Sequence, residues 1–490
     1  MPLRIFINLW QFQNCILNLA ADSTMDILLT HGYFLYDDPK EQAIMKPYPT
    51  LGLLYISAYL KQKNFAVEIF DSTFAEKSQY ADLLVTKKPK LVGIYSNLMT
   101  KFNVLEMIRQ AKAQNCTVIA GGPDPPYYAE QYLEFGADVV VIGEGEKILQ
   151  ELIPILSSGK LEKLAAVAGI VFKDERGQIQ RTPARDLLPN LDVLPLPDRA
   201  AIDQQKYVNV WRQHHGMGAV SLITSRGCPY SCTWCSHSVY GKTLRKRSAH
   251  LVTDEVEGIL ATYHPDMLWY ADDVFNINHK WFFEYAAELK RRNLKIPFEC
   301  ICRADRMNEE IVRALKEMGC FRVWIGSESG SQRLLDAMKR GVKAEQVQAM
   351  TRLAKRHGIE TGMFLMWGFE DENRDDIEMT IEHVKKANPD LILTTVSYPI
   401  KGTEYYNRMA EQNAVVANGA WQNSNDRDYR IHGRHSKRYY DFVNRWMYNE
   451  LALTRLQENG RNALLRRTKA RVQAEISKLG MALTANQKEV

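Results

Sequence analysis

Three cysteines lie close together near the middle of the chain, in the segment Cys228-Pro-Tyr-Ser-Cys232-Thr-Trp-Cys235. Their CxxxCxxC spacing allows each thiolate to hold a different iron atom of a 4Fe–4S cluster, which leaves the fourth iron without a protein ligand. An open iron is what substrate or cofactor chemistry needs. Zinc is the competing metal, because His237 would complete a Cys₃His set. Zinc motifs usually pair two CxxC units, however, and no second unit follows, so the spacing favours a cluster.

The composition is that of an ordinary globular protein. The chain has 490 residues, of which 46% are hydrophobic and 25% charged, and this excludes collagen-like, disordered and disulfide-stapled proteins. No run of 18 apolar residues predicts a membrane-spanning helix. Eight cysteines, three of them clustered, indicate metal in a reducing compartment rather than a disulfide framework. We therefore expect a cytoplasmic protein.

The elements that must position the motif begin with a domain expected over residues 25–158. Five strands separated by single helices predict an α/β domain with a parallel, doubly wound sheet. Such sheets bind ligands at the carboxyl ends of their strands. The expected strands are Asp26–Thr30, Ala66–Asp71, Lys90–Ser96, Cys116–Gly121 and Asp138–Gly143. The candidate residues at strand ends, where ordinary turns use the same residue types, are Ser96, Leu98, Gly121, Gly122, Gly143 and Gly145.

Two segments flank this domain. Residues 1–24 are interpreted as a partly ordered extension or as the result of a start codon placed too far upstream, because polar residues interrupt the apolar stretch that a signal peptide would need. Residues 159–215 are expected to form a connector. A hairpin is predicted around Gly177, and four prolines after it argue against long helices. We expect little further structure in the connector.

The alternation of strands and helices resumes over residues 216–405. Six βα units in one run predict an open or partial (β/α)6 barrel, whose active site lies at the carboxyl ends of the strands. The expected strands are Ala219–Thr224, Met267–Ala271, Phe298–Cys302, Arg322–Ser327, Thr361–Trp367 and Leu391–Tyr398. The cysteine motif follows the first of them, and Asp272, Asp273, Arg303 and Glu328 stand at later strand ends. Residues 406–490 are expected to be helical and basic, with 14 Lys/Arg against 7 Asp/Glu from residue 421 onward.

A CxxxCxxC motif after a first barrel strand, with an aromatic residue before the third cysteine, resembles the radical S-adenosylmethionine (radical SAM) superfamily. The resemblance implies that Cys228, Cys232 and Cys235 bind a 4Fe–4S cluster whose open iron chelates the methionine part of S-adenosylmethionine. An electron from the cluster then cleaves the C5′–S bond and gives a 5′-deoxyadenosyl radical, which abstracts a hydrogen. The electron would come from an external donor such as flavodoxin or ferredoxin.

The same resemblance suggests roles for other residues. It implies that Trp234 lies against the adenine, that Asp272 or Asp273 lies near the methionine amino group, and that Arg303 pairs with the methionine carboxylate. Here the chain has paired Asp residues where the family commonly has Gly-Gly-Glu. Glu328 would bind ribose hydroxyls or an ammonium group. Capping of helices explains Asp272 and Glu328 equally well from the sequence alone.

The doubly wound domain before such a barrel resembles the cobalamin-binding subclass of the superfamily, which includes the class B methylases. The segments that carry the resemblance are Pro47–Leu60, Ser96-x-Leu98, Gly121-Gly122 and Gly143-Glu-Gly-Glu146. The Asp-x-His-x-x-Gly motif that supplies a histidine to cobalt is absent. His31 stands at a strand end, where a lone histidine is usually structural. We therefore expect cobalamin to bind without a histidine from that motif.

The function implied is radical methylation of an unactivated carbon in a small-molecule, lipid or tetrapyrrole substrate. The alternative is oxidative cyclisation or rearrangement by the same architecture, as in the anaerobic magnesium-protoporphyrin monomethyl ester cyclase. A methylthiotransferase acting on nucleic acid would need three more cluster cysteines in its first domain, and this chain has only Cys116 there. A non-enzymatic sensor would not need a complete barrel with candidate binding residues at its strand ends.

Two further features admit structural or functional interpretations. Cys300 and Cys302 share one face of the third barrel strand and are interpreted as core residues rather than as redox partners. The basic tail is interpreted as a solvated helical face, with contact to an anionic substrate or to a membrane surface as the alternatives. Its leading members are Arg427, Arg430, Arg434, Lys437 and Arg438, followed by Tyr439 and Tyr440.

Overall fold

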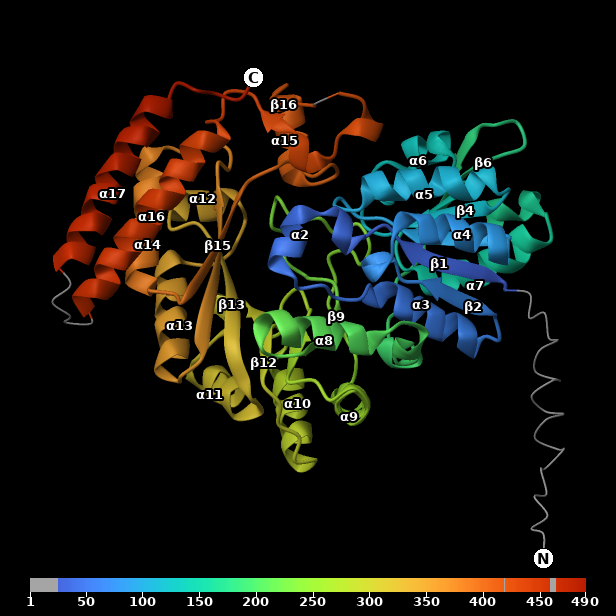
Figure 1. Ribbon diagram of the computed structural model, residues 1–490, viewed down its shortest axis with the longest axis horizontal. Helices are drawn as coiled ribbons and strands as arrows, with labels where there is room; N and C mark the ends of the chain where they lie inside the picture. The colour runs from blue at the N-terminus through green and yellow to red at the C-terminus, as the bar shows by residue number, and fades with distance from the viewer. Residues whose placement is uncertain (1–24, 418, 459–463) are drawn as a thin grey trace, which may run out of the picture.

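The computed structural model describes residues 25–417, 419–458 and 464–490 (Figure 1). The expected extension, residues 1–24, lies outside the described residues. Two α/β units stand side by side, and a helical tail covers the far side of the second unit (Figure 1). Within the described ranges, no helix has both the length and the apolar character needed to cross a bilayer.

The first unit, called the sheet domain below, is built on a seven-stranded sheet. Its first five strands are parallel and have the order β2-β1-β3-β4-β5, as a doubly wound fold requires. They are β1 (Ile27–His31), β2 (Val67–Phe70), β3 (Leu91–Tyr95), β4 (Thr117–Gly121) and β5 (Val139–Val141). The predicted hairpin of β6 (Ile170–Lys173) and β7 (Ile179–Arg181) extends this sheet in antiparallel fashion.

Helices cover both faces of this sheet. Helices α3 (Leu51–Gln62) and α7 (Gly145–Ser157) pack on one face, where Leu53 and Ile148 meet Leu29 and Ile119. The opposite face is covered by α4 (Lys77–Lys87), α5 (Lys101–Ala113) and α6 (Ala129–Phe135). A short helix, α2 (Pro39–Ile44), follows β1. The predicted α/β class and the doubly wound topology are both confirmed.

The second unit, called the barrel below, has six parallel strands in the order β15-β14-β13-β12-β11-β8, which confirms the predicted partial barrel. The strands are β8 (Ala219–Leu222), β11 (Met267–Tyr270), β12 (Phe298–Cys302), β13 (Cys320–Glu328), β14 (Glu360–Trp367) and β15 (Leu391–Val396). The helices are α9 (Ala249–Tyr263), α10 (His279–Arg291), α11 (Glu309–Met318), α12 (Gln332–Ala337), α13 (Ala344–Arg356) and α14 (Arg374–Ala387).

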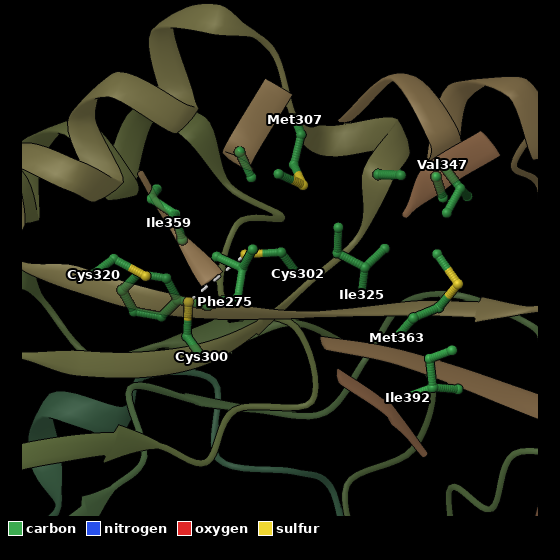
Figure 2. Packing of buried hydrophobic residues seen from close by; sticks show 14 of the residues in the cluster. Phe275, Cys300, Cys302, Met307, Cys320, Ile325, Val347, Ile359, Met363 and Ile392 are labelled. Carbon is green, nitrogen blue, oxygen red and sulfur yellow. Dashed lines mark hydrogen bonds between the residues drawn. The ribbon is translucent and has the colours of Figure 1, made fainter. Parts of the chain in front are cut away.

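The barrel core lies between these strands and helices. Cys300, Cys302 and Cys320 are fully buried there, beside Phe275 and Ile325 (Figure 2). The sulfurs of Cys300 and Cys302 are 3.7 Å apart, which confirms that they share one face of β12. Their neighbours are apolar, and burial raises the pKa of the Cys300 thiol well above its ordinary value. These thiols therefore pack as small apolar groups.

The connector contains more structure than its prolines suggested. Helix α8 (Gln204–His215) begins after the last of them, and the Asp203 side chain caps it by accepting from the Lys206 amide at 3.0 Å. Its buried residues include Tyr207 and Trp211, one turn apart, and Tyr207 donates to Asp71 of the sheet domain at 2.8 Å. An amphipathic helix thus forms where we expected an irregular surface linker.

The tail is mainly helical, as predicted. It contains α15 (Glu404–Glu411) and the antiparallel helices α16 (Lys437–Glu458) and α17 (Leu464–Thr484), which form the outer edge of the molecule (Figure 1). One difference is an antiparallel pair of two-residue strands, β16 (Val415–Val416) and β17 (Arg430–Ile431). Strands of that length leave no periodic signal in a sequence.

Candidate active site

The three cysteines of the motif lie on a loop between two short antiparallel strands, β9 (Ser225–Arg226) and β10 (Arg245–Lys246). Gly227 opens the loop with φ +81°, and a Cβ there would lie 2.5 Å from the Thr243 carbonyl oxygen, so only glycine fits. Thr233, inside the motif, donates its amide to the Met338 carbonyl at 3.0 Å and accepts from the Tyr405 amide at 2.8 Å. The loop is thus held from both sides.

The thiols of this loop are half-buried, unlike the core cysteines. Burial raises the pKa of Cys235 to about 12 and also raises that of Cys228, so both remain protonated unless a metal stabilises the thiolates. In the described part of the chain, no three His, Cys, Asp or Glu side chains are close enough to share one metal ion. A cluster does not require such closeness, because each thiolate binds a different iron. The arrangement fits a cluster better than zinc.

Polar groups without partners surround this loop. Among the described buried side-chain atoms that lack a hydrogen bond are the Thr233 hydroxyl, the Trp234 indole nitrogen and Nε2 of His237 on the loop itself. Arg303 Nη1 and Arg340 Nε, from the neighbouring barrel segments, also lack one. Because buried polar groups are normally satisfied in native proteins, such a concentration indicates a site for a polar ligand. The residues present therefore fit a cluster with a polar cofactor beside it.

Arg303 and Arg340 bring positive charge to the loop. Arg303, which follows β12, donates to Asp305 at 2.8 Å and to the Arg340 carbonyl at 2.7 Å, and it lies over the Tyr230 ring at 3.6 Å. Arg340, in the turn after α12, points its Nη1 at the Cys232 sulfur, 3.7 Å away. These contacts leave part of each guanidinium available to an anionic group. No sequence motif had marked Arg340.

The two candidate carboxylates after β11 have different environments. Asp272 is fully buried and accepts from the amides of Thr224 and Ser225 at 2.6 and 3.1 Å, with Lys246 at 3.4 Å. It therefore fixes the turn that leads into the cysteine loop. Asp273 is exposed and lines the cavity described below, and desolvation beside that cavity together with the Asp272 charge raises its pKa. Of the two, only Asp273 faces the space that a cofactor would fill.

Two other residues named from the sequence lie on the barrel side of the loop. Glu328 ends β13 with φ +67° and is paired with Arg340 at 3.8 Å, and burial raises its pKa against the opposing effect of Arg340. The Trp234 ring packs against an apolar cluster that includes Phe369 and Tyr405. Its indole nitrogen is buried without a partner. Both side chains thus adjoin the cysteine loop.

A cavity of about 310 Å³ connects the sheet domain to the cysteine loop. Its wall on the loop side includes Cys228, Ser236–Gly241 and Asp273. Its wall on the other side runs deep into the sheet domain between α3, α7 and the sheet, past Leu29, Gly52, Gly93 and Ile119. A Cβ on Gly52 would meet no atom within 4 Å, so this glycine leaves open space. The apolar arm is suited to a flat ring and the polar end to a charged group.

The glycines predicted at strand ends all line this cavity, but Ser96 and Leu98 do not. The lining glycines are Gly121, Gly122, Gly143 and Gly145. Ser96 is fully buried, and its hydroxyl lies 2.7 Å from that of Tyr132. His31 is also occupied, because it contacts Asp71 at 3.0 Å and the Tyr33 amide at 3.2 Å. It does not line the cavity, and its structural interpretation stands.

A buried ion-pair network joins the two units beside the cavity. Arg226, two residues before Cys228, binds Glu144 at 2.7 Å and Glu146 at 2.5 Å, and Arg245 binds Glu144 at 2.8 Å. All four side chains are at least 90% buried. The Gly-Glu-Gly-Glu segment is visible in the sequence, but its pairing with Arg226 and Arg245 is not, and the only local signal for it is the two carboxylates spaced two residues apart.

The tail makes a second connection between the units. Lys101 of the sheet domain donates to the Ser424 carbonyl at 2.5 Å and lies 4.3 Å from the centre of the Trp421 ring. The Asp426 carboxylate accepts from the Tyr128 hydroxyl and, at 2.8 Å, from the amide of Lys401. Nothing in the sequence pattern indicated this contact between Lys101 and Ser424, which are more than 300 residues apart in the chain.

A second cavity of about 700 Å³ lies between the end of β15, residues 423–430 and the first half of α16. Arg427 and Arg430 bring positive charge to it, whereas Lys437 is paired with Asp441 at 3.0 Å, and Asp428 and Glu489 add negative charge. Arg434 also lines it, but that guanidinium is already paired with Glu489 at 2.7 Å. Ser397 in its wall lies 3.1 Å from the Tyr405 hydroxyl, and the Tyr405 amide binds Thr233 of the cysteine loop. The cavity is therefore a neighbour of the loop.

Comparison with known proteins matches both units to families. Residues 222–384 match the radical SAM superfamily, and residues 44–153 match the B12 binding domain. An uncharacterised methyltransferase of Pyrococcus horikoshii is 30% identical over 391 residues, which cover 77% of this chain and 83% of that protein. The anaerobic magnesium-protoporphyrin IX monomethyl ester cyclase of Rubrivivax gelatinosus is 25% identical over 355 residues, covering 70% of this chain and 63% of that one.

Solved structures show the same fold. The radical S-adenosylmethionine methyltransferase TsrM of Kitasatospora setae, with cobalamin and a [4Fe–4S] cluster bound, superposes with a TM-score of 0.68 at 22% identity over 81% of each chain. The cobalamin-dependent S-adenosylmethionine radical enzyme OxsB, with aqua-cobalamin bound, superposes with a TM-score of 0.72 at 19% identity. That match covers 92% of this chain and 71% of OxsB.

Proposed function

Because this chain belongs to the radical SAM superfamily and carries a B12 binding domain, we propose that it is a cobalamin-dependent methylase acting on an unactivated carbon. The family supplies S-adenosylmethionine and a 4Fe–4S cluster, and the B12 binding domain supplies cobalamin. One observation carries the proposal. A single cavity is lined both by the strand-end glycines of the sheet domain and by Cys228 and Asp273 of the barrel. Two cofactors can thus act in one enclosed space.

Each candidate residue has a defined task in this proposal. Cys228, Cys232 and Cys235 hold the cluster, which supplies the electron for cleavage of S-adenosylmethionine. Asp273 and Glu328 offer carboxylates to the ammonium and hydroxyl groups of that molecule. Arg303, whose Nη1 has no hydrogen bond, and Arg340, which also faces Glu328 at 3.8 Å, offer positive charge to its carboxylate. The apolar walls of the cavity exclude water, which protects a reactive radical from side reactions.

The glycines hold the second cofactor by leaving room for it. Gly121, Gly122, Gly143 and Gly145 line the sheet edge that a large ring would approach, and Gly52, where an added Cβ would meet no atom within 4 Å, leaves space for its tail between the sheet and its helices. Among the described histidines, only His237, on the loop side, lines the cavity. Cobalt would therefore have no histidine from the sheet domain, in agreement with the missing motif.

The substrate side of the site is the second cavity. It lies at the carboxyl end of β15, where barrels place their active sites, and a chain of two contacts connects it to the cysteine loop. Arg427 and Arg430 form no ion pair with the described residues. We propose that they bind an anionic small-molecule, lipid or tetrapyrrole substrate. Arg430→Gln should then raise KM while leaving substrate-free 5′-deoxyadenosine formation unchanged.

Iron analysis tests the ligand assignment. Anaerobically purified protein with a reconstituted cluster should hold about four irons and four sulfides per chain. Cys232→Ala should lose them, whereas the matched change Cys300→Ala in the core should not. Full iron retention by Cys232→Ala would refute the assignment, and one zinc per chain would favour the competing metal.

Product analysis tests the reaction. With S-adenosylmethionine and an external reductant such as flavodoxin, the loaded enzyme should release 5′-deoxyadenosine, and the Cys232 variant should not. A methylase also releases S-adenosylhomocysteine and transfers a deuterated methyl group from S-adenosylmethionine to its product. A cyclase of the same architecture, favoured by the resemblance to the Rubrivivax enzyme, would release 5′-deoxyadenosine with no labelled methyl in the product.

A further inference from the structure

Helix α17 has two apolar faces, and only one of them is covered. Ala470, Ala474, Ser477, Met481 and Thr484 are buried against the rest of the protein, chiefly α16. A second apolar set, spaced every three to seven residues, is exposed to between 51% and 87%: Leu465, Val472, Ile476, Leu479 and Leu483. Figure 1 shows α17 at the outer edge of the molecule, on the side away from the sheet domain.

The exposed set forms one continuous stripe. At about 100° of rotation per residue, its five members fall within an arc of about 60°. The centre of that arc lies nearly opposite the buried face. Single exposed apolar residues are normal on protein surfaces, but an ordered row of five large aliphatic side chains marks a surface that contacts another phase or another molecule.

Positive charge borders the stripe on both sides. From Leu464 to Thr484 the helix carries five Lys or Arg residues against one Glu, a net charge of +4. On the same helical wheel Lys469 lies about 20° beyond one border of the stripe and Arg471 about 80° beyond the other, while Arg467 lies about 150° from its centre. These residues and Arg466 form no ion pair with any described residue, whereas Lys478 is paired with Glu475 at 2.8 Å. The unpaired charge is thus concentrated in the first half of the helix.

We infer that α17 lies flat on an anionic lipid bilayer, with its aliphatic stripe in the acyl boundary and its basic residues at the headgroups. An apolar stripe bordered by Lys and Arg is the pattern of helices that lie in the membrane interface. The long basic side chains can extend along the helix toward the phosphates while their alkyl stems remain in contact with lipid. Anionic lipids attract each of these charges.

The charge also decides between this surface and a second copy of the chain. Pairing two stripes would bring two helices of net charge +4 together. A bilayer rich in phosphatidylglycerol offers the opposite charge. The inference rests on α17 alone and does not depend on the proposed reaction, because docking requires neither the cluster nor cobalamin.

Vesicle binding tests the inference directly. The full-length protein should sediment with vesicles of phosphatidylglycerol and phosphatidylcholine, and binding should weaken at least tenfold in vesicles of phosphatidylcholine alone. The double change Val472→Asp and Ile476→Asp should weaken binding at least tenfold, because both side chains point away from the fold. Val85→Asp on α4 is the matched control, since Val85 is exposed to 52%, as Val472 is to 51%, and it should bind like the wild type.

The electrostatic part is tested separately by Lys469→Gln with Arg471→Gln, which should reduce binding and its sensitivity to salt. Far-ultraviolet circular dichroism should show unchanged helix content in every variant. Failure of the wild type to bind anionic vesicles at millimolar lipid would overturn the inference, as would unaltered binding by the aspartate variant. A lipid-free dimer that the aspartate change dissociates, without any vesicle binding, would also overturn it and assign the stripe to a second copy.

Discussion

Replacement of Arg226 by Met tests whether the buried ion pairs hold the cysteine loop against the sheet domain. The change removes the positive charge shared by Glu144 and Glu146 but keeps a side chain of similar length. Glu144 retains donors from Arg245 and from the Leu188 amide, each at 2.8 Å. Glu146 loses the only ion-pair partner that the described structure gives it. One buried carboxylate is therefore left without compensation.

The expected loss in the free energy of unfolding follows from this one unpaired carboxylate. Breaking a buried pair by removing one partner costs about 3–5 kcal/mol, because the remaining charge stays desolvated. Adding Glu146→Gln to the Arg226→Met variant should recover a large part of the loss, since the stranded charge disappears. The control is Lys280→Met, which removes an exposed pair with Glu284 at 4.0 Å and should cost less than about 1 kcal/mol.

The assay is urea unfolding at pH 7 followed by tryptophan fluorescence, read as the free energy of the first transition. The Arg226 pairs lower the pKa of Glu144 in the folded protein despite its burial. Its contribution is therefore present above its unfolded pKa, about 4.3, and is lost as the pH falls further. The difference between wild type and Arg226→Met should shrink in the same range. An Arg226→Met protein within 1 kcal/mol of wild type at pH 7 would refute the reasoning.

Three further perturbations probe other parts of the molecule. Gly52→Leu should abolish the binding of one hydroxocobalamin per chain, measured by absorbance, while the iron content stays unchanged. A Cβ at Gly52 would point into the open space of the cavity, so tight cobalamin binding by this variant would contradict the assigned cavity. Asp272→Asn leaves Lys246 buried without its carboxylate partner, so it should lower the free energy of unfolding by about 3–5 kcal/mol. It should also lower the iron occupancy, and normal iron occupancy would argue against the role of Asp272 in positioning the cysteine loop. Burial raises the pKa of Glu372 to about 8, so the wild-type protein should lose stability as the pH rises from about 4.5 to 8, by at most about 1.4 kcal/mol per pH unit. Glu372→Gln should flatten that pH dependence, as measured by thermal unfolding.

The elements that follow from local periodicity were predictable. Strands such as β3 and β12 are short apolar runs bounded by turn residues, and alternation with helices determined both topologies. The cysteine motif was equally visible, because its information lies within eight residues. The sequence also placed Cys300 and Cys302 on one face of their strand, since side chains alternate along any strand.

What could not be predicted depends on contacts between distant parts of the chain. Nothing local distinguishes Asp272 from Asp273, and only the amides of Thr224 and Ser225, nearly 50 residues earlier, commit Asp272 to a structural role. Arg340 reaches Cys232 across more than 100 residues. Helix α8 was missed for another reason, since the prolines before it lowered the expectation of helix although none lies within it.

The contact of Asp426 and Ser424 with the sheet domain has a consequence for biosynthesis. About 20 residues separate Tyr405, the last residue that holds the cysteine loop, from Asp426. At a translation rate of about 5–20 residues per second, the ribosome needs roughly 1–4 s to add them. When Tyr405 has been made, every residue that lines the interdomain cavity has been made, but the tail segment that ties the units together has not. A nascent chain therefore has a short period in which a bulky cofactor can enter before the tail joins the two units.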